Sequence, residues 1–217
     1  MKTKQLLLKS FTVVAAVLTM SACTSLGSSR DVANPGVPGK VVAVQVCSNC
    51  HGVTGESTSP AFPKLAGQQK EYLAAQLADF KGHDRSDSRG TQYMWGFTHL
   101  TAGQVDELAD YFSSQPAMRA HIGQSALLVR GEQIFNNGIP ENEVVACMAC
   151  HGPKAEGNGG FPRLAGQHAS YVVEQLKVFK HTDQRPRGAA MKQITHALSD
   201  QDMEAVAQYL ASIGSPR

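Results

Sequence analysis

The chain has 217 residues, of which 42% are hydrophobic, and a formal net charge of +2. This length and composition fit one or two globular domains and exclude a chain dominated by disorder. Removal of residues 1–22 would take away three lysines and no acidic residue, which leaves a formal charge of −1. The remaining protein therefore lacks the clustered basic charge of a nucleic-acid-binding protein.

The N-terminus predicts an export signal over residues 1–22. Lys2, Lys4 and Lys9 precede the apolar run "FTVVAAVLTM", and the small residues "SAC" end at Cys23. The run is about half the ~20 residues that a membrane span needs, which disfavours an uncleaved anchor. "MSAC" resembles a bacterial lipobox, in which Cys23 becomes the lipidated first residue, although Met20 stands where Leu is usual. A secreted protein without lipid is the alternative.

Residues 23–40 are predicted to form a flexible tether. The stretch "TSLGSSRDVANPGVPGK" at 24–40 is rich in Ser, Gly and Pro and offers little to bury. A flexible chain of this length spans about 20 to 25 Å, enough to hold a domain just off a membrane surface.

Two cysteine motifs, "CSNCH" at 47–51 and "CMACH" at 147–151, stand one hundred residues apart. Disulfides, a thioredoxin-like redox pair and a four-cysteine zinc site are alternatives, but none of them needs a histidine directly behind each pair. Cys-x-x-Cys-His is the signature of covalent c-type haem attachment, in which both thiols bind the haem and the histidine ligates the iron. The motifs therefore predict two haem c groups, with attachment and iron-ligand residues Cys47, Cys50, His51, Cys147, Cys150 and His151.

The motifs lie on an internal repeat. "FPKLAGQ" at 62–68 matches "FPRLAGQ" at 161–167, and "EYLAAQLADFK" at 71–81 matches "SYVVEQLKVFK" at 170–180. Helical spacing of apolar residues recurs in both stretches, behind a Thr101 to Gln104 capping box and behind Ser199, and no stretch alternates as a strand does. The sequence predicts an all-α protein with two tandem helical domains, 41–117 and 118–217, each built around a covalently attached haem.

The sixth ligand of each iron is predicted to be methionine. Met94 and Met191 follow the motif histidines by 43 and 40 residues and precede the last helix of each unit. Met148 lies between two attachment cysteines, and Met203 falls on the apolar stripe of the last helix. His99 and His196 are the competing ligands. The surroundings "YMWGF" and "AMKQI" differ, and Lys192 beside the second methionine would disfavour the ferric iron.

The two units resemble class I cytochrome c domains, and the chain over about 41–217 resembles the two-haem cytochrome c4 family. The features that carry the resemblance are "CSNCHG" and "CMACHG", the two "LAGQ" stretches, and the late methionines. The resemblance implies that the carbonyls of Pro63 and Pro162 accept the N–H of the motif histidines. It also makes Arg89 and Arg187 candidates to pair with haem propionates.

The resemblance implies an electron carrier of a bacterial periplasmic respiratory chain rather than an enzyme. Its expected partners are a membrane electron donor and a haem-copper oxidase or other terminal acceptor, with membrane association through the lipid on Cys23 and no nucleic acid. An electron-transfer subunit of a specific dehydrogenase complex is one alternative. A two-haem peroxidase is another, but its two haem sites should differ, whereas here each unit offers a methionine at the matching place.

Overall fold

The computed structural model describes residues 29–97, 99–121 and 125–215, so the predicted export signal and Cys23 lie outside the described residues. In these three ranges the chain forms helices joined by loops, with a few isolated β-bridges and no strand. The predicted all-α fold is confirmed.

The first unit places short helical turns around the first cysteine motif and then two longer helices. Its elements are α2 (Gly39–Val42), the π-helix η1 (Ala43–Cys47), α3 (Ser48–His51), α4 (Lys70–Lys81), the π-helix η2 (Gly90–Met94), the 3₁₀-helix η3 (Trp95–Phe97) and α5 (Ala102–Ser113). The predicted capping box is present, because Thr101 and Gln104 exchange hydrogen bonds at the start of α5.

The second unit follows the same order but begins with a long helix. Its elements are α6 (Ser125–Asn137), the 3₁₀-helix η4 (Pro140–Asn142), α7 (Met148–His151), α8 (Ala169–His181), the 3₁₀-helix η5 (Pro186–Gly188), α9 (Ala189–Thr195) and α10 (Asp200–Ser212). The sequence analysis predicted α8 and α10 but neither α6 nor α9.

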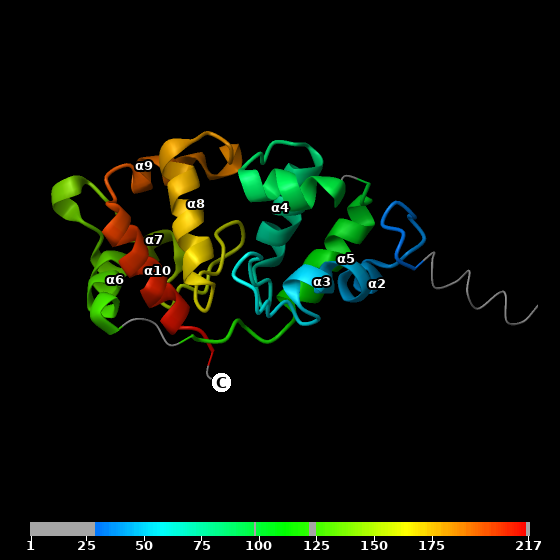
Figure 1. Ribbon diagram of the computed structural model, residues 1–217, viewed down its shortest axis with the longest axis horizontal. Coiled ribbons are helices and arrows are strands. Elements are labelled where there is room, and N and C mark those ends of the chain that lie inside the picture. Colours follow the sequence, from blue (N-terminus) through cyan, green and yellow to red (C-terminus); the bar gives the residue numbers. More distant parts are fainter. Residues whose placement is uncertain (1–28, 98, 122–124, 216–217) are drawn as a thin grey trace, which may run out of the picture.

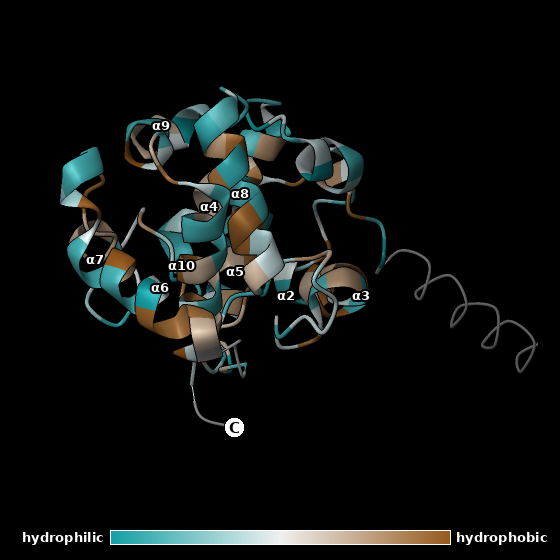
Figure 2. Ribbon diagram, turned by 60° about the vertical axis from the view of Figure 1, so that its left-hand side comes forward, coloured by the Kyte–Doolittle hydropathy of each residue, from teal (hydrophilic) through white to brown (hydrophobic). Residues whose placement is uncertain are grey.

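The two units lie side by side along the long axis of the molecule, with α4 and α8 nearest its middle (Figure 1). Each unit has its own core: Val42, Leu108 and Phe112 are buried in the first, whereas Phe135 and Met203 are buried in the second. Met203 is therefore a core residue, as its place on the apolar stripe predicted. Apolar and polar stretches alternate along the helices (Figure 2), as expected for helices that pack on one face.

The segment just before the first motif is packed, although the sequence predicted a tether up to residue 40. Gln104 donates to the carbonyls of Asn34 and Val37 at 3.0 and 2.9 Å, and the backbone N–H of Gly39 donates to Glu107. Val37 is buried against the first core. The expected boundary is thus wrong for residues 34–40, because their backbone groups find partners on α5.

None of the helices in the described ranges has the length and apolar character that a bilayer span requires.

Candidate functional site

Each cysteine motif forms a single helical turn, and this turn places both thiols and the imidazole on the same side of the helix. In the second unit the backbone N–H groups of Cys150 and His151 donate to the Cys147 carbonyl, at 3.3 and 3.1 Å. Residues i, i+3 and i+4 share one helix face, so these three side chains point to one side. The first motif is arranged in the same way around α3.

A glycine ends each motif turn in a conformation that other residues rarely adopt. Gly52 has φ 79° and Gly152 has φ 80°, and each donates its N–H four residues back, to the carbonyls of Ser48 and Met148. The positive φ turns the chain sharply away from the helix, which needs glycine at this position. The following loop then returns to the motif histidine.

The proline carbonyl on that returning loop fixes each histidine ring. His51 Nδ1 lies 2.8 Å from the Pro63 oxygen, and His151 Nδ1 lies 2.9 Å from the Pro162 oxygen. Because a carbonyl can only accept, Nδ1 is the protonated nitrogen and Nε2 is left with a free lone pair. Burial lowers the pKa of both imidazoles, which favours this neutral form. The hydrogen bonds that the family resemblance implied are present in both units.

The four cysteines of the two motifs are free thiols. Before haem attachment, burial raises the pKa of the Cys47 and Cys147 thiols to about 11, so both are then protonated at neutral pH. Cys50 and Cys150 lie at the surface. Each motif thus pairs one partly buried thiol with one exposed thiol.

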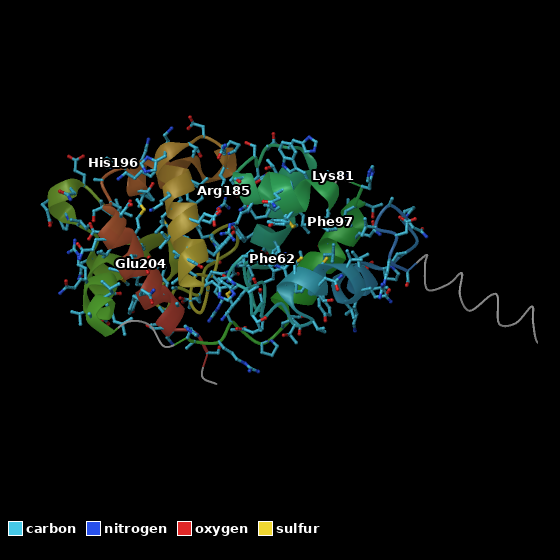
Figure 3. All side chains as sticks on the ribbon, in the orientation of Figure 1. Phe62, Lys81, Phe97, Arg185, His196 and Glu204 are labelled. Atoms are coloured by element: carbon cyan, nitrogen blue, oxygen red, sulfur yellow. The ribbon has the colours of Figure 1, made fainter. Side chains whose placement is uncertain are left out.

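An apolar cavity is lined by residues of both units and receives nearly all of the predicted site residues. These are Cys47, His51, Met94, Cys147, Cys150, His151 and Met191, whereas Cys50 does not line it. The competing ligands His99 and His196 do not line the cavity either, and both are exposed. Figure 3 shows His196 near the outer margin of the second unit, beside α9.

Two arginines and two glutamines form a polar cluster at the contact between the units, which the sequence did not predict. Arg85 donates to Gln76 at 2.8 Å within its own unit and to Gln175 of the second unit at 3.2 Å. Arg185 mirrors it, donating to Gln175 at 2.6 Å and to Gln76 at 2.8 Å. Figure 3 shows Arg185 between the two units. The signal available in the sequence was that the glutamines recur at matching places of the repeat.

The two arginines named by the resemblance also line the cavity, but both pair with carboxylates across the contact between the units. Arg89 lies 2.6 Å from Glu174, and Arg187 lies 2.6 Å from the buried Asp79. Lys192 is exposed and pairs with Asp183 at 2.6 Å. Solvent and this carboxylate screen its charge, so the expected electrostatic effect of Lys192 on the second site is small.

The side chains around the cavity fit a haem in each unit. The thiols are free to form thioethers, and the histidines keep Nε2 available on the cavity side. The walls are largely apolar, as the macrocycle requires. Arg89 and Arg187 line the cavity and could pair with the carboxylates of a haem. The buried Nε2 of Gln175 has no partner among the described residues.

Comparisons with known proteins agree with this geometry. A family profile described as Cytochrome c matches residues 37–116 and 128–214. Cytochrome c4 of Stutzerimonas stutzeri is 35% identical over 211 residues, which cover 93% of this chain and 98% of the relative. A thiosulfate dehydrogenase electron acceptor of Stutzerimonas stutzeri (strain A1501) is 34% identical over 211 residues, covering 93% of each chain. The crystal structure of reduced recombinant cytochrome c4 from Pseudomonas stutzeri has a TM-score of 0.73 at 35% identity, covering 81% of this chain and 96% of that one.

Proposed function

The chain belongs to the two-haem cytochrome c4 family, and we propose that it moves single electrons through the bacterial periplasm from a membrane donor to a terminal acceptor. As a member of this family it carries two haem c groups and is an electron carrier rather than an enzyme. A haem-copper oxidase or another terminal reductase is the proposed acceptor.

We assign one haem to each cysteine motif. Cys47 and Cys50 hold the first through thioether bonds and His51 ligates its iron, while Cys147, Cys150 and His151 do the same for the second. When bound, each iron supplies a one-electron couple. The observation that carries the assignment is the proline hydrogen bond, in which Nδ1–H donates to the proline carbonyl and Nε2 of each histidine is left as the metal-binding nitrogen.

Met94 and Met191 are assigned as the residues that would supply the second protein ligand of each iron. Both line the cavity with the motif histidines, and the exposed His99 and His196 do not. A thioether ligand raises the reduction potential and fills the position that a substrate of a peroxidase would need. Two filled sites therefore favour electron transfer over chemistry on a bound substrate.

A second candidate function is service as the dedicated electron acceptor of one dehydrogenase. The relative named as a thiosulfate dehydrogenase electron acceptor supports it, because the similarity extends over 93% of both chains. The two functions differ in the partner and not in the chemistry. Purification from native membranes separates them: a dedicated acceptor co-purifies with its dehydrogenase, whereas a general carrier is reduced by several membrane donors at comparable rates.

We also propose that residues 1–22 direct export and that Cys23 carries lipid, with the residues from Cys23 to about 28 as the tether, because Ser29 already bonds to Gln45 and Val32 packs against the first core. Residues 1–28 lie outside the described residues, and the support for the lipid is the sequence "MSAC". Several acyl chains anchor a protein stably, where one does so only marginally. Cys23→Ala should block processing or release a soluble protein, and release of the unaltered protein by high salt alone would contradict the lipid anchor.

Covalent loading tests the haem assignment. Thioether bonds survive denaturation, so the intact mass of the denatured protein should exceed that of the polypeptide by two haems. The double variant Cys47→Ser, Cys50→Ser should lose one haem and keep the other, and Cys147→Ser, Cys150→Ser should do the reverse. A single haem mass on the unaltered protein would refute the assignment.

A further inference from the structure

Two glutamines cross the contact between the units and hold each other's proline loops. Gln167 accepts from the backbone N–H of Lys64 and donates to the Lys64 carbonyl, both at 2.9 Å. Gln68 accepts from the backbone N–H of Arg163 at 2.6 Å and donates to the Arg163 carbonyl at 2.9 Å. Only 5% of Gln68 and 4% of Gln167 is exposed, so water does not compete for these bonds.

The peptide that Gln167 holds is the peptide that orients the first motif histidine. The Pro63–Lys64 peptide offers its oxygen to His51 Nδ1 at 2.8 Å and its N–H to Gln167 at 2.9 Å. Donation through the N–H makes the carbonyl of the same peptide a stronger acceptor, because hydrogen bonds in a chain polarise one another. A continuous chain of hydrogen bonds therefore links a side chain of the second unit to the histidine of the first.

An equivalent chain of hydrogen bonds links a side chain of the first unit to the histidine of the second. The Pro162–Arg163 peptide offers its oxygen to His151 Nδ1 at 2.9 Å and its N–H to Gln68 at 2.6 Å. The proline and the glutamine come from the same repeated stretch, "FPKLAGQ" or "FPRLAGQ". Each copy of the stretch thus supports the histidine of its own unit with its proline and the histidine of the other unit with its glutamine.

We propose that Gln167 and Gln68 are positioning residues that tune the iron of the opposite unit. The inference rests on the proposed function, in which His51 and His151 are iron ligands. A stronger carbonyl acceptor draws on the Nδ1 proton and makes Nε2 a more basic ligand. A more basic ligand stabilises ferric over ferrous iron, so each glutamine lowers the reduction potential of the haem on the other side of the contact.

Two variants test directly whether each glutamine acts on the haem of the opposite unit. Gln167→Met keeps the length of the side chain and removes its acceptor, so the hydrogen bond of His51 Nδ1–H should weaken and the potential of the first haem should rise. The ferric-to-ferrous ratio at fixed potential should fall by up to about tenfold, which corresponds to about 59 mV for one electron. Gln68→Met should do the same to the second haem through His151. In each variant the haem of the altered unit should keep its potential.

The readouts are the two reduction potentials and the NMR shift and solvent-exchange rate of each histidine Nδ1–H, assigned separately. Gln69→Met is the matched control, because Gln69 Nε2 donates across the same contact at 2.8 Å but to the carbonyl of Glu156, away from the proline peptides. Gln167→Asn and Gln68→Asn, shorter by one carbon, replace the methionine variants if these do not fold.

The inference is overturned if Gln167→Met moves only the second haem, if it moves both haems equally, or if Gln69→Met has the same effect as Gln68→Met. Unchanged Nδ1–H signals of His51 and His151 in the two variants would overturn it as well. Failure of the proposed function has a different signature, because the unaltered protein would then lack haem-shifted ring signals from His51 and His151.

Discussion

Met94 and Met191 reach the cavity from different local structures. Met94 ends the π-helix η2, whereas Met191 lies in the first turn of α9. A π-helical turn is uncommon and is often found at functional sites. The equivalent position in the sequence therefore does not mean an equivalent backbone, and the two methionines proposed as ligands have different surroundings.

Replacement of these methionines gives a prediction at the scale of single residues. Ferric haem with a methionine ligand has a weak red absorption band, so Met94→Ala and Met191→Ala should each remove one of two contributions to it. The exposed His99 and His196 are matched controls, and their alanine variants should leave the band unchanged. Absorption spectra of the oxidised variants measure the band. Its loss in a histidine variant would refute the methionine assignment.

At the scale of elements, the last helix of each unit begins with a reciprocal cap. Thr101 and Gln104 form the capping box of α5, and Ser199 and Asp202 form that of α10. Asp202 also accepts from Arg130 of α6 at 2.8 Å. Each cap thus satisfies backbone N–H groups that the helix itself leaves without partners.

Loss of either cap should lower the free energy of unfolding by about 1 kcal/mol. Thr101→Ala and Ser199→Ala are the two variants, and chemical denaturation is the measurement. Ser113→Ala removes an exposed hydroxyl that bonds only to the Asp110 carbonyl, so its effect should stay within about 0.5 kcal/mol. Equal effects of all three variants would contradict the role of the caps.

The longer helices were predictable from sequence to different degrees. Apolar spacing and caps indicated α4, α5, α8 and α10. Helix α6 was not predicted, because Gly131 lowers the helix propensity of its sequence. In the structure, a Cβ added to Gly131 would lie 2.1 Å from the Ala205 carbonyl oxygen of α10. Gly131 thus allows the close crossing of two helices, which only the tertiary structure reveals.

The residues of the site also differ in whether the sequence alone could predict them. The cysteines and histidines were readable because covalent attachment needs them close together in the sequence. Arg85, Arg185 and the two buried glutamines Gln68 and Gln167 were not readable, since they act across the contact between the units. Repetition of "AGQ" was a signal, but nothing local says that its glutamine reaches the other unit.

The molecule as a whole is a duplicated structure with unequal halves. Arg85 and Arg185 mirror each other, and each lies 4.6 Å from the ring of a matching phenylalanine. Asp87 pairs with Arg85 at 2.6 Å, whereas the second unit has Arg187 at the comparable place, bonded to Asp79 of the first. Charge is therefore distributed differently around the two sites, and two distinct reduction potentials are expected.

A spectroelectrochemical titration of the purified protein tests the two-haem carrier most directly. The account predicts two one-electron couples at positive potential, resolved or overlapping, with the red band of methionine-ligated ferric haem present in the oxidised state and lost on reduction. A five-coordinate iron, ready binding of peroxide, or a couple at the low potential of an iron with two histidine ligands would contradict it.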